Sequence, residues 1–290
     1  GGNDDGALGH GDTVSRPSPT RVAALHEGGH KVFSVACGSR HTLALDDQGT
    51  LFSWGWGAYG QLGHGSVSGC LVPTEVEELD RLGLTLGPNS GCQLACGYRH
   101  SMVLVPKGGH PSPAEPGGQL LGASGAGGAI APREVYAWGW GRHGQLGLGG
   151  WDDELLPKRV AALAPLGVLK LVLGGRHSLA LCAGGRVYAW GRDDDGQLGL
   201  GAQGGRCVPT LLPLIPDPSL ELRVLDAACG WAHTALLVSV TAAAGYPDPI
   251  SPPRGKASRS RRRGPRLIVW ADLEGLFGQV LGSSIQFMLV

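Results

Sequence analysis

The sequence predicts an all-β fold, and its composition carries that prediction. The 290 residues include 51 Gly and 20 Pro, which interrupt helices and favour tight turns. The glycines do not recur every third residue, so collagen is excluded, and an apolar fraction of 42% is enough to build a core. Apolar runs stay shorter than the roughly 18 residues that a membrane-spanning helix needs. We therefore expect a soluble, turn-rich chain without a membrane partner.

A repeated pattern divides the sequence into units of about 50 to 60 residues. Each unit has an apolar strand ending in Trp-Gly, then Gly-Gln-Leu-Gly, a Pro, a second apolar strand ending in Gly-x-x-His, and an alternating apolar run. The Trp-Gly pairs lie at 54–55, 138–139 and 190–191, and the Gly-Gln-Leu-Gly segments at 60–63, 144–147 and 196–199. The segments with the histidine lie at 38–41, 97–100, 174–177 and 230–233.

Each unit offers four short strands. In the unit 46–105, apolar alternation bounded by glycine predicts strands at 50–54, 72–76, 93–96 and 101–105. Four strands per repeat at this period indicate a blade of a β-propeller and argue against a helical solenoid. Trp54, Trp138 and Trp190 are expected to fill the space between blades, where each indole N–H will need an acceptor.

With this order of motifs, the chain resembles the regulator of chromosome condensation repeat family, over residues 3–238. Kelch and WD40 propellers lack the order of Gly-Gln-Leu-Gly followed by Gly-x-x-His-Thr. The resemblance implies a ring of typically seven blades, which at about 55 residues each would need about 400 residues. We expect about three complete and two partial blades here. Their open edges would meet flanking sequence or cause self-association.

The predicted domain plan follows the repeats. Propeller repeats occupy 1–238, as a partial unit 3–45 and units 46–105, 133–182 and 183–238, with a Gly- and Pro-rich insert at 106–132. In the first unit Ala7 takes the place of the repeat glutamine. Residues 239–266 read as a basic linker rich in Pro and Arg, and 267–290 as a degenerate partial repeat.

Charge is unevenly divided along a chain whose formal net charge is zero. The segment 254–266 is basic and contains no acid, which leaves a mildly acidic body. It is interpreted either as a nuclear-import signal or phosphate-binding patch for chromatin or nucleic acid, or as a solvated loop. Its candidate residues are Arg259, Arg261, Arg262, Arg263 and Arg266. Seven cysteines, an odd number, do not indicate a disulfide framework, so we expect a reducing cytoplasmic or nuclear compartment.

The sequence predicts neither an enzyme nor a cofactor site. Two Gly-x-Gly-x-x-Gly strings, at 55–60 and 139–144, belong to the repeat and precede no helix, so dinucleotide binding is not expected. The histidines recur once per blade, which would spread them around a ring and not gather them on a metal, so each is expected to make a structural hydrogen bond. These are His41, His100, His177 and His233. Cys37, Cys96 and Cys229 share one repeat position and are expected to be small buried thiols.

Two classes of function remain. The first is a non-catalytic protein–protein interaction platform, whose loops present a surface to partners. The second, implied by the founding member of the family, is guanine-nucleotide exchange on a Ran-like small GTPase, which leaves no local motif. The candidate partner-binding residues are Trp56, Tyr59, Trp140, His143, Asp193, Asp195 and Trp231.

A further alternative comes from plant members of the family, which sense ultraviolet-B with tryptophans in Gly-Trp-Arg-His-Thr motifs on neighbouring blades. Here only Trp231 holds that position, and the other units have Ser39, Tyr98 and Gly175. One tryptophan at this position is too few for an excitonically coupled cluster, so this alternative is disfavoured. Arg40, Arg99 and Arg176 occupy the next position and are expected to form ion pairs.

Overall fold

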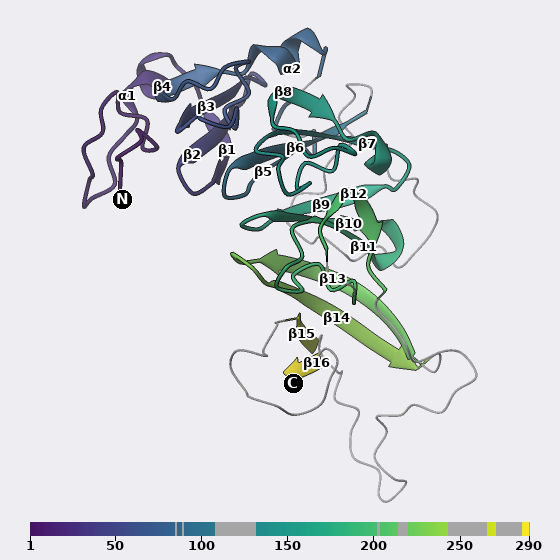
Figure 1. Cartoon of the computed structure of the whole chain (residues 1–290). Coiled ribbons are helices and arrows are strands. Elements are labelled where there is room, and N and C mark those ends of the chain that lie inside the picture. Colours follow the sequence, from purple (N-terminus) through teal and green to yellow (C-terminus); the bar gives the residue numbers. More distant parts are fainter. Residues whose placement is uncertain are drawn as a thin grey trace, which may run out of the picture.

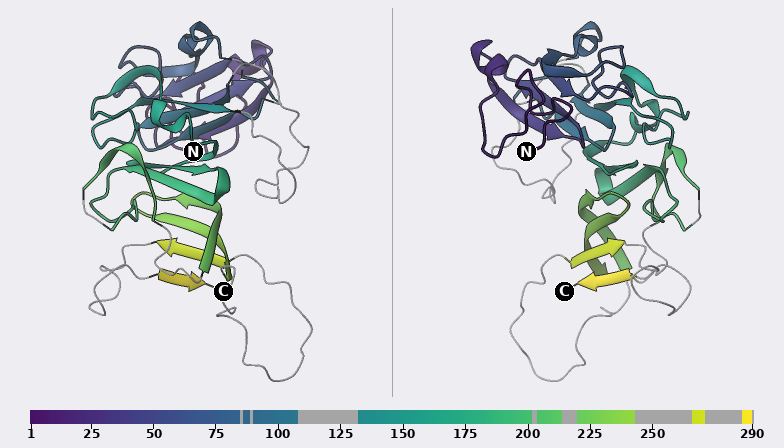
Figure 2. Two further views of the ribbon diagram at one scale, coloured as in Figure 1. Left: turned by 90° about the vertical axis from the view of Figure 1, so that its right-hand side faces the viewer. Right: turned by 60° about the vertical axis from the view of Figure 1, so that its left-hand side comes forward.

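The described part of the chain folds into four antiparallel sheets of four strands each. The computed structural model describes residues 1–84, 86–88, 90–107, 132–201, 204–213, 220–242, 266–270 and 286–289. The sheets follow one another in chain order from the N-terminal to the C-terminal end (Figure 1). Two further views show the same succession, with the strands near the C-terminus at the opposite end from the first sheet (Figure 2). The prediction of an all-β protein built from four-stranded propeller blades is confirmed.

Every sheet is a simple up-and-down meander. The first contains β1 (Val32–Cys37), β2 (His41–Asp46), β3 (Leu51–Gly55) and β4 (Cys70–Glu75), and the second contains β5 (Gln93–Cys96), β6 (His100–Pro106), β7 (Arg133–Gly139) and β8 (Glu154–Arg159). The third contains β9 (Val168–Leu173), β10 (His177–Cys182), β11 (Arg186–Gly191) and β12 (Arg206–Leu211). The fourth contains β13 (Leu220–Cys229), β14 (Thr234–Ala242), β15 (Arg266–Trp270) and β16 (Gln286–Leu289). A short helix, α1 (Ala23–Glu27), precedes β1, and the short helix α2 (Glu77–Arg81) and the 3₁₀ turns Ala161–Leu163 and Ala183–Gly185 lie between strands.

The repeat of the sequence and the sheet of the structure are offset by two strands. The predicted unit 46–105 does contain four strands, but β3 and β4 close the first sheet whereas β5 and β6 open the second. The same offset lets the three complete and two partial units assemble as four sheets. Each repeat therefore links two neighbouring sheets covalently. The predicted insert 106–132 and linker 239–266 lie mostly outside the described residues, and the domain plan stays a prediction.

The hydrophobic core lies between successive sheets. Leu43 and Leu45 of the first sheet pack in one buried cluster with Val103 and Trp138 of the second. Corresponding clusters fill the space between the second and third sheets and between the third and fourth. Because each sheet buries apolar side chains against its neighbour, the sheets stabilise one another, and the turns at their ends are held in fixed relative positions.

The repeat tryptophans and the Gly-Gln-Leu-Gly turns lock neighbouring sheets together. Trp138 is fully buried, and its Nε1–H donates to the carbonyl oxygen of Gln61 in the preceding unit at 2.9 Å. Gly63 has a φ of 78°, which favours glycine, and a Cβ there would collide with the Trp138 indole nitrogen. Both the backbone conformation and the lack of space therefore exclude a larger residue. Trp190 donates to Gln145 at 2.8 Å and Trp54 to Ala7 at 2.9 Å. The predicted placement of the tryptophans, and their need for acceptors, are confirmed.

Candidate partner-binding surface

The repeat histidines belong to the framework of the fold. His100 Nε2 lies 3.0 Å from the Ser178 hydroxyl of the next sheet, and that hydroxyl donates to the Gln145 carbonyl oxygen at 2.8 Å. Because a serine hydroxyl has one proton to donate, it accepts from the imidazole, and His100 carries its proton on Nε2. We call this chain of hydrogen bonds, from the imidazole to a hydroxyl and on to a carbonyl oxygen, the histidine relay. The same relay joins His41, Ser101 and Gln61, and also His177, Thr234 and Gln197.

These three histidines are neutral at pH 7. Burial lowers the pKa of His41 and of His177 to about 4, and burial together with the neighbouring histidines lowers the pKa of His100 to about 3. The expected structural hydrogen bond is confirmed for all three. Within the described residues, no group of three His, Cys, Asp or Glu side chains is placed to hold a metal ion.

The cysteine position of the repeat is less uniform than expected. Cys96 and Cys229 are partly buried, and burial raises the pKa of both thiols, that of Cys229 to about 12. Cys37 is exposed, so the prediction of a buried thiol is wrong there. The reason is that β1 alternates between half-buried and exposed residues, and Cys37 lies on its exposed side together with Phe33 and Val35.

Strand register brings two distant motifs together at one end of each of the first three sheets. In the second sheet His100 pairs with Gly139, so the residues just before β6 meet those just after β7. The Trp140 N–H donates to the Arg99 carbonyl oxygen at 2.9 Å and fixes this meeting. The first sheet repeats the arrangement, with Trp56 N–H donating to the Arg40 carbonyl oxygen at 2.8 Å. In the third sheet the tryptophan position holds Arg192, whose N–H donates to Arg176 at 2.9 Å.

The turns of three neighbouring sheets and the Trp231 turn together form a cluster of rings and guanidinium groups. We call it the aromatic–arginine face. It comprises Arg40, Trp56, Tyr59, Tyr98, Arg99, Trp140, His143, Arg176 and Trp231. The glutamine of each Gly-Gln-Leu-Gly turn shapes it, because the Gln61 Oε1 accepts from the Tyr59 N–H and the Gln145 Oε1 from the His143 N–H, both at 2.9 Å.

Ring contacts form two groups on this face. The ring centroid of Tyr59 lies 5.3 Å from that of Trp56 and 5.5 Å from that of Trp140. His143 then contacts Trp140 edge to face at 4.7 Å. Tyr98 contacts Trp231 edge to face at 4.4 Å. Such tilted and edge-to-face pairs are the favourable aromatic geometries and hold the rings in place.

Arg99 lies at the centre of the face. Its guanidinium carbon is 4.7 to 5.1 Å from the ring centroids of Tyr98, Trp56, Tyr59 and Trp140. One Nη donates to the Tyr59 hydroxyl at 3.1 Å. Arg176 lies 5.3 Å from the Trp140 ring and 5.7 Å from the Trp231 ring, and thereby connects the two groups of rings. Cation–π attraction is the main interaction of both side chains.

The expected ion pairs of the repeat arginines form at one position only. Arg40 pairs with Asp5 at 3.2 Å. Arg99 and Arg176 make no ion pair with any carboxylate that the structure describes, so for them the prediction is wrong. Their guanidinium groups are placed over aromatic rings instead, because the tryptophans that follow β3 and β7 occupy the space beside them.

The acidic turn of the third sheet differs from its expected role. Asp193 is 2% exposed and its carboxylate accepts from the Leu198 N–H at 2.9 Å, so it shapes its own turn and is not displayed to a partner. Burial raises its pKa. Asp194 is exposed instead and pairs with Arg192 at 2.6 Å. Asp195 is half-exposed and lies 3.7 Å from the same guanidinium.

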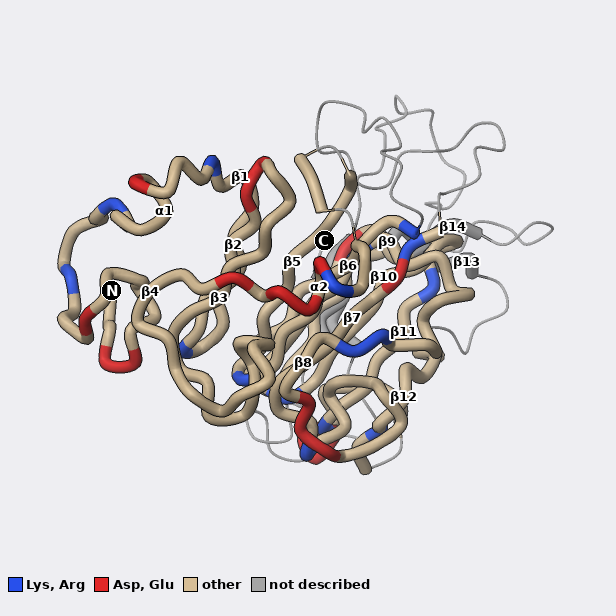
Figure 3. Tube along the Cα trace, turned by 90° about the horizontal axis from the view of Figure 1, so that it is seen from above, with Lys and Arg blue, Asp and Glu red and all other residues tan. Residues whose placement is uncertain are grey.

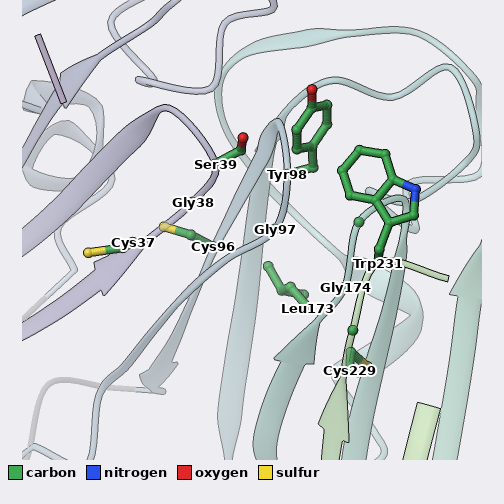
Figure 4. A pocket seen from close by; sticks show the side chains of 12 residues that line it. Cys37, Gly38, Ser39, Cys96, Gly97, Tyr98, Leu173, Gly174, Cys229 and Trp231 are labelled. Atoms are coloured by element: carbon green, nitrogen blue, oxygen red, sulfur yellow. The ribbon is translucent and has the colours of Figure 1, made fainter. Parts of the chain in front are cut away.

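A pocket of about 300 Å³ adjoins the face. It is lined by the ends of the innermost strands β1, β5, β9 and β13 and by the glycines that follow them. Figure 4 shows the Tyr98 and Trp231 rings together at one end of it and three cysteines away from them. Because these two rings also contact Arg99 and Arg176, the pocket and the face are continuous.

The structure brings most of the candidate residues together and leaves others untested. Trp56, Tyr59, Trp140, His143 and Trp231 share the face. The basic residues Arg259, Arg261, Arg262 and Arg263 lie outside the described residues, and for Arg266 only its place at the start of β15 is described. Over the described chain, Lys and Arg are interspersed with Asp and Glu (Figure 3).

Sequence reasoning missed the central members of the face, Arg99 and Tyr98, as partner-binding residues. A signal was present, because arginine precedes the repeat histidine at 40, 99 and 176, and Trp-Gly is followed by Trp twice. Only strand register shows that these two motifs lie side by side. The packing of neighbouring sheets gives Trp231 two neighbours, Tyr98 and Arg176, whereas the repeat position alone suggested an isolated tryptophan.

The fold and its turns define the chain as a repeat protein of the propeller class. The model of the regulator of chromosome condensation (RCC1) repeat matches residues 1–45, 48–104, 134–181 and 184–237. The chain belongs to this family, as the order of its motifs indicated.

Two relatives and two solved structures show the range of the family. The chain is 34% identical to the Arabidopsis thaliana ultraviolet-B receptor UVR8, over 81% of this chain and 45% of the receptor, and 34% identical to the human E3 ubiquitin-protein ligase HERC2, over 83% of this chain and 4% of the ligase. It therefore spans less than half of the length of either relative.

The structures are similar in fold. Human WBSCR16 aligns with a TM-score of 0.62 at 23% identity, over 100% of this chain and 60% of WBSCR16. Prp20p from Saccharomyces cerevisiae, described with its binding to Gsp1p and histones, aligns with a TM-score of 0.52 at 20% identity, over 78% of this chain and 47% of Prp20p. Within the described residues, no helix is long and apolar enough to cross a membrane. A cytoplasmic or nuclear location stays a prediction.

Proposed function

We propose that this chain is a non-catalytic protein-interaction platform and that the aromatic–arginine face is its docking surface. The observation that carries the proposal is the placement of Arg99 among four aromatic rings on turns from neighbouring sheets. Tryptophan, tyrosine and arginine are the side chains that dominate binding energy in protein interfaces.

The rigidity of the face supports the same function. Each of its turns is fixed by backbone bonds such as the one between Trp140 and Arg99, and the sheets beneath are locked by the histidine relays. A surface that is ordered before binding loses little side-chain entropy on docking. Trp231, which is 51% exposed beside the pocket, offers a large apolar area to a partner.

Paired alanine variants test the proposal. Trp231→Ala removes an exposed ring from the face, whereas Trp151→Ala removes a ring of similar exposure, 48%, that makes no ring contact with the face. Proteins captured from an extract of the source cells by the wild-type chain should be retained by the Trp151 variant and lost by the Trp231 variant. Equal capture by both variants would contradict the proposal.

Ultraviolet-B reception, which the name of the Arabidopsis relative suggests, stays the disfavoured alternative. The face holds three tryptophans, but within the described residues their rings are joined through tyrosine and arginine and not to one another. The platform predicts an elution volume that ultraviolet-B does not change. Dissociation of an oligomer under illumination would favour the receptor.

Nucleotide exchange on a Ran-like small GTPase is tested separately. Prp20p is described with Gsp1p binding, but its likeness to this chain extends to the fold alone. The platform predicts that the purified chain leaves the release of labelled GDP from such a GTPase unchanged. Accelerated release of GDP would contradict the non-catalytic platform and would indicate that the chain is an exchange factor.

A further inference from the structure

The aromatic–arginine face contains hydrogen-bond donors that lack acceptors. The Nε atoms of Arg99 and Arg176 and the indole nitrogen of Trp140 are buried and have no hydrogen-bond partner among the described residues. Trp140 as a whole is 7% exposed. All three groups are donors, and two of them belong to cations. A buried donor without an acceptor is costly, and the cost is larger for a charged group.

Neighbouring charges leave this part of the face positive. Arg40, Arg142 and Arg192 are matched by Asp5, Asp153 and Asp194, at 3.2, 3.7 and 2.6 Å. Arg99 and Arg176 have no such match in the described part of the chain. The pKa of His143 is consistent with this positive charge. Burial lowers it most, the charges of Arg176 and Arg192 lower it further, and Asp194 opposes them.

The two unmatched guanidinium groups are neighbours. Both lie over the Trp140 ring, Arg99 at 5.1 Å and Arg176 at 5.3 Å from its centroid. Their Nε atoms are buried, so a ligand reaches these half-buried side chains at the terminal Nη groups. The N–H groups of a guanidinium suit a carboxylate, and rings that exclude water strengthen such a bond. Two carboxylates on adjacent or nearby residues of one peptide are thus the matching ligand.

We propose that the aromatic–arginine face binds a peptide segment that carries a pair of acidic side chains, one carboxylate for Arg99 and one for Arg176. This inference rests on the proposed function and names the chemistry of the partner. The matched pairs around the site argue against a long polyanion, because Arg40, Arg142 and Arg192 are already paired with carboxylates of this chain and leave its flanking charges without a free cation. The segment is therefore acidic at its centre and neutral or basic on either side.

Selection from a displayed library of random dodecapeptides tests the inference with the full chain. Peptides that bind the wild type should be enriched in adjacent or next-but-one Asp or Glu residues. A double variant, Arg99→Met with Arg176→Met, keeps the long unbranched stems over the rings and removes both charges. It should bind the selected peptides at least about tenfold more weakly, as expected for the loss of charge-assisted hydrogen bonds.

Arg186→Met is the matched control. Arg186 is exposed and begins β11, at the opposite end of that strand from Gly191 and the face. This variant loses a positive charge without touching the site, and it should bind the selected peptides like the wild type. A second measurement needs no variant: replacing Asp and Glu by Asn and Gln in a selected peptide should weaken its binding to the wild-type chain, and added salt should weaken the acidic form only.

The outcomes separate this inference from the platform. Peptides that depend on Trp231 but carry no acidic excess, or that bind the double arginine variant unchanged, would overturn the carboxylate site and leave the platform standing. A library without any binder sensitive to Trp231 or to the arginine pair would contradict both. Tighter binding of a thymidine 20-mer than of any peptide, lost in the double arginine variant, would replace the acidic peptide by a nucleic acid.

Discussion

The histidine relay predicts that a single hydroxyl stabilises the contact between two sheets. In Ser178→Ala the His100 Nε2–H loses its acceptor inside the core, while the Gln145 carbonyl oxygen keeps the Trp190 indole N–H at 2.8 Å. The cost is therefore that of one buried unsatisfied donor, about 1–3 kcal/mol in the free energy of unfolding.

Denaturant unfolding followed by tryptophan fluorescence measures this difference. The interaction between His100 and Ser178 is isolated by repeating Ser178→Ala in a His100→Leu background, where the imidazole donor is already absent. There the substitution should cost at least about 1 kcal/mol less than in the wild type. Equal costs in the two backgrounds, or a loss below about 0.5 kcal/mol in the single alanine variant, would refute the relay.

Three further predictions follow from the same framework. Gly97→Ala should lower the free energy of unfolding by about 2 kcal/mol or more, because the added Cβ would collide with the His100 ring; an unchanged denaturation midpoint would contradict this. The three buried relay histidines have pKa values of about 3 to 4, below the ordinary 6.5, so the unfolded chain binds more protons between those limits. The stabilisation that these histidines contribute is therefore complete above pH 6.5 and should fall as the pH drops toward about 4, by about 3 kcal/mol per histidine, which pH-dependent unfolding would measure; a flat profile over this range would refute it. Iodoacetamide at neutral pH should alkylate exposed Cys37 well before Cys182 and Cys229, whose pKa values burial raises to about 11 and about 12, and peptide mass spectrometry would detect the reverse order.

Much of the fold follows from local sequence because the repeat motifs encode local geometry. Trp-Gly and Gly-Gln-Leu-Gly place an indole N–H against a turn carbonyl. The repeated Trp-Gly predicts the buried indole and its need for an acceptor, whereas the structure identifies the acceptor. Even the atypical first copy obeys the rule: Ala7 replaces glutamine, yet its backbone carbonyl oxygen still accepts from Trp54 and from Thr42. A backbone acceptor tolerates the change of side chain.

The offset between repeat and sheet could not be predicted from the pattern alone. A unit of four strands has the same sequence whether the four pair with one another or divide between two sheets. The choice is made by long-range packing, in which Leu51 of β3 belongs with β2 while Leu94 of β5 faces it from the next sheet.

The candidate site was predictable in most of its aromatic residues, but neither its central arginine, Arg99, nor its electrostatics could be predicted. Tryptophan and tyrosine on loops indicated a binding surface, and five of the seven candidates meet on it. Whether an arginine of the face has an ion-pair partner depends on neighbours that sequence spacing does not reveal. Arg40 pairs with Asp5, whereas the Arg99 guanidinium lies over four aromatic rings. The prediction that Asp193 contacts a partner was wrong because its carboxylate is buried in the turn and accepts a hydrogen bond from the Leu198 N–H.

Photo-crosslinking tests the central claim most directly. A benzophenone side chain is placed at position 231 on the aromatic–arginine face, and in a second variant at position 208 on β12, where Val208 is 44% exposed. After irradiation in the source cells, the account predicts that a discrete partner protein crosslinks at 231 and not at 208, and that Arg99→Met with Arg176→Met abolishes the product. The same crosslinked partner at both positions, or a product that is unaffected by loss of the two arginines, would contradict docking on this face.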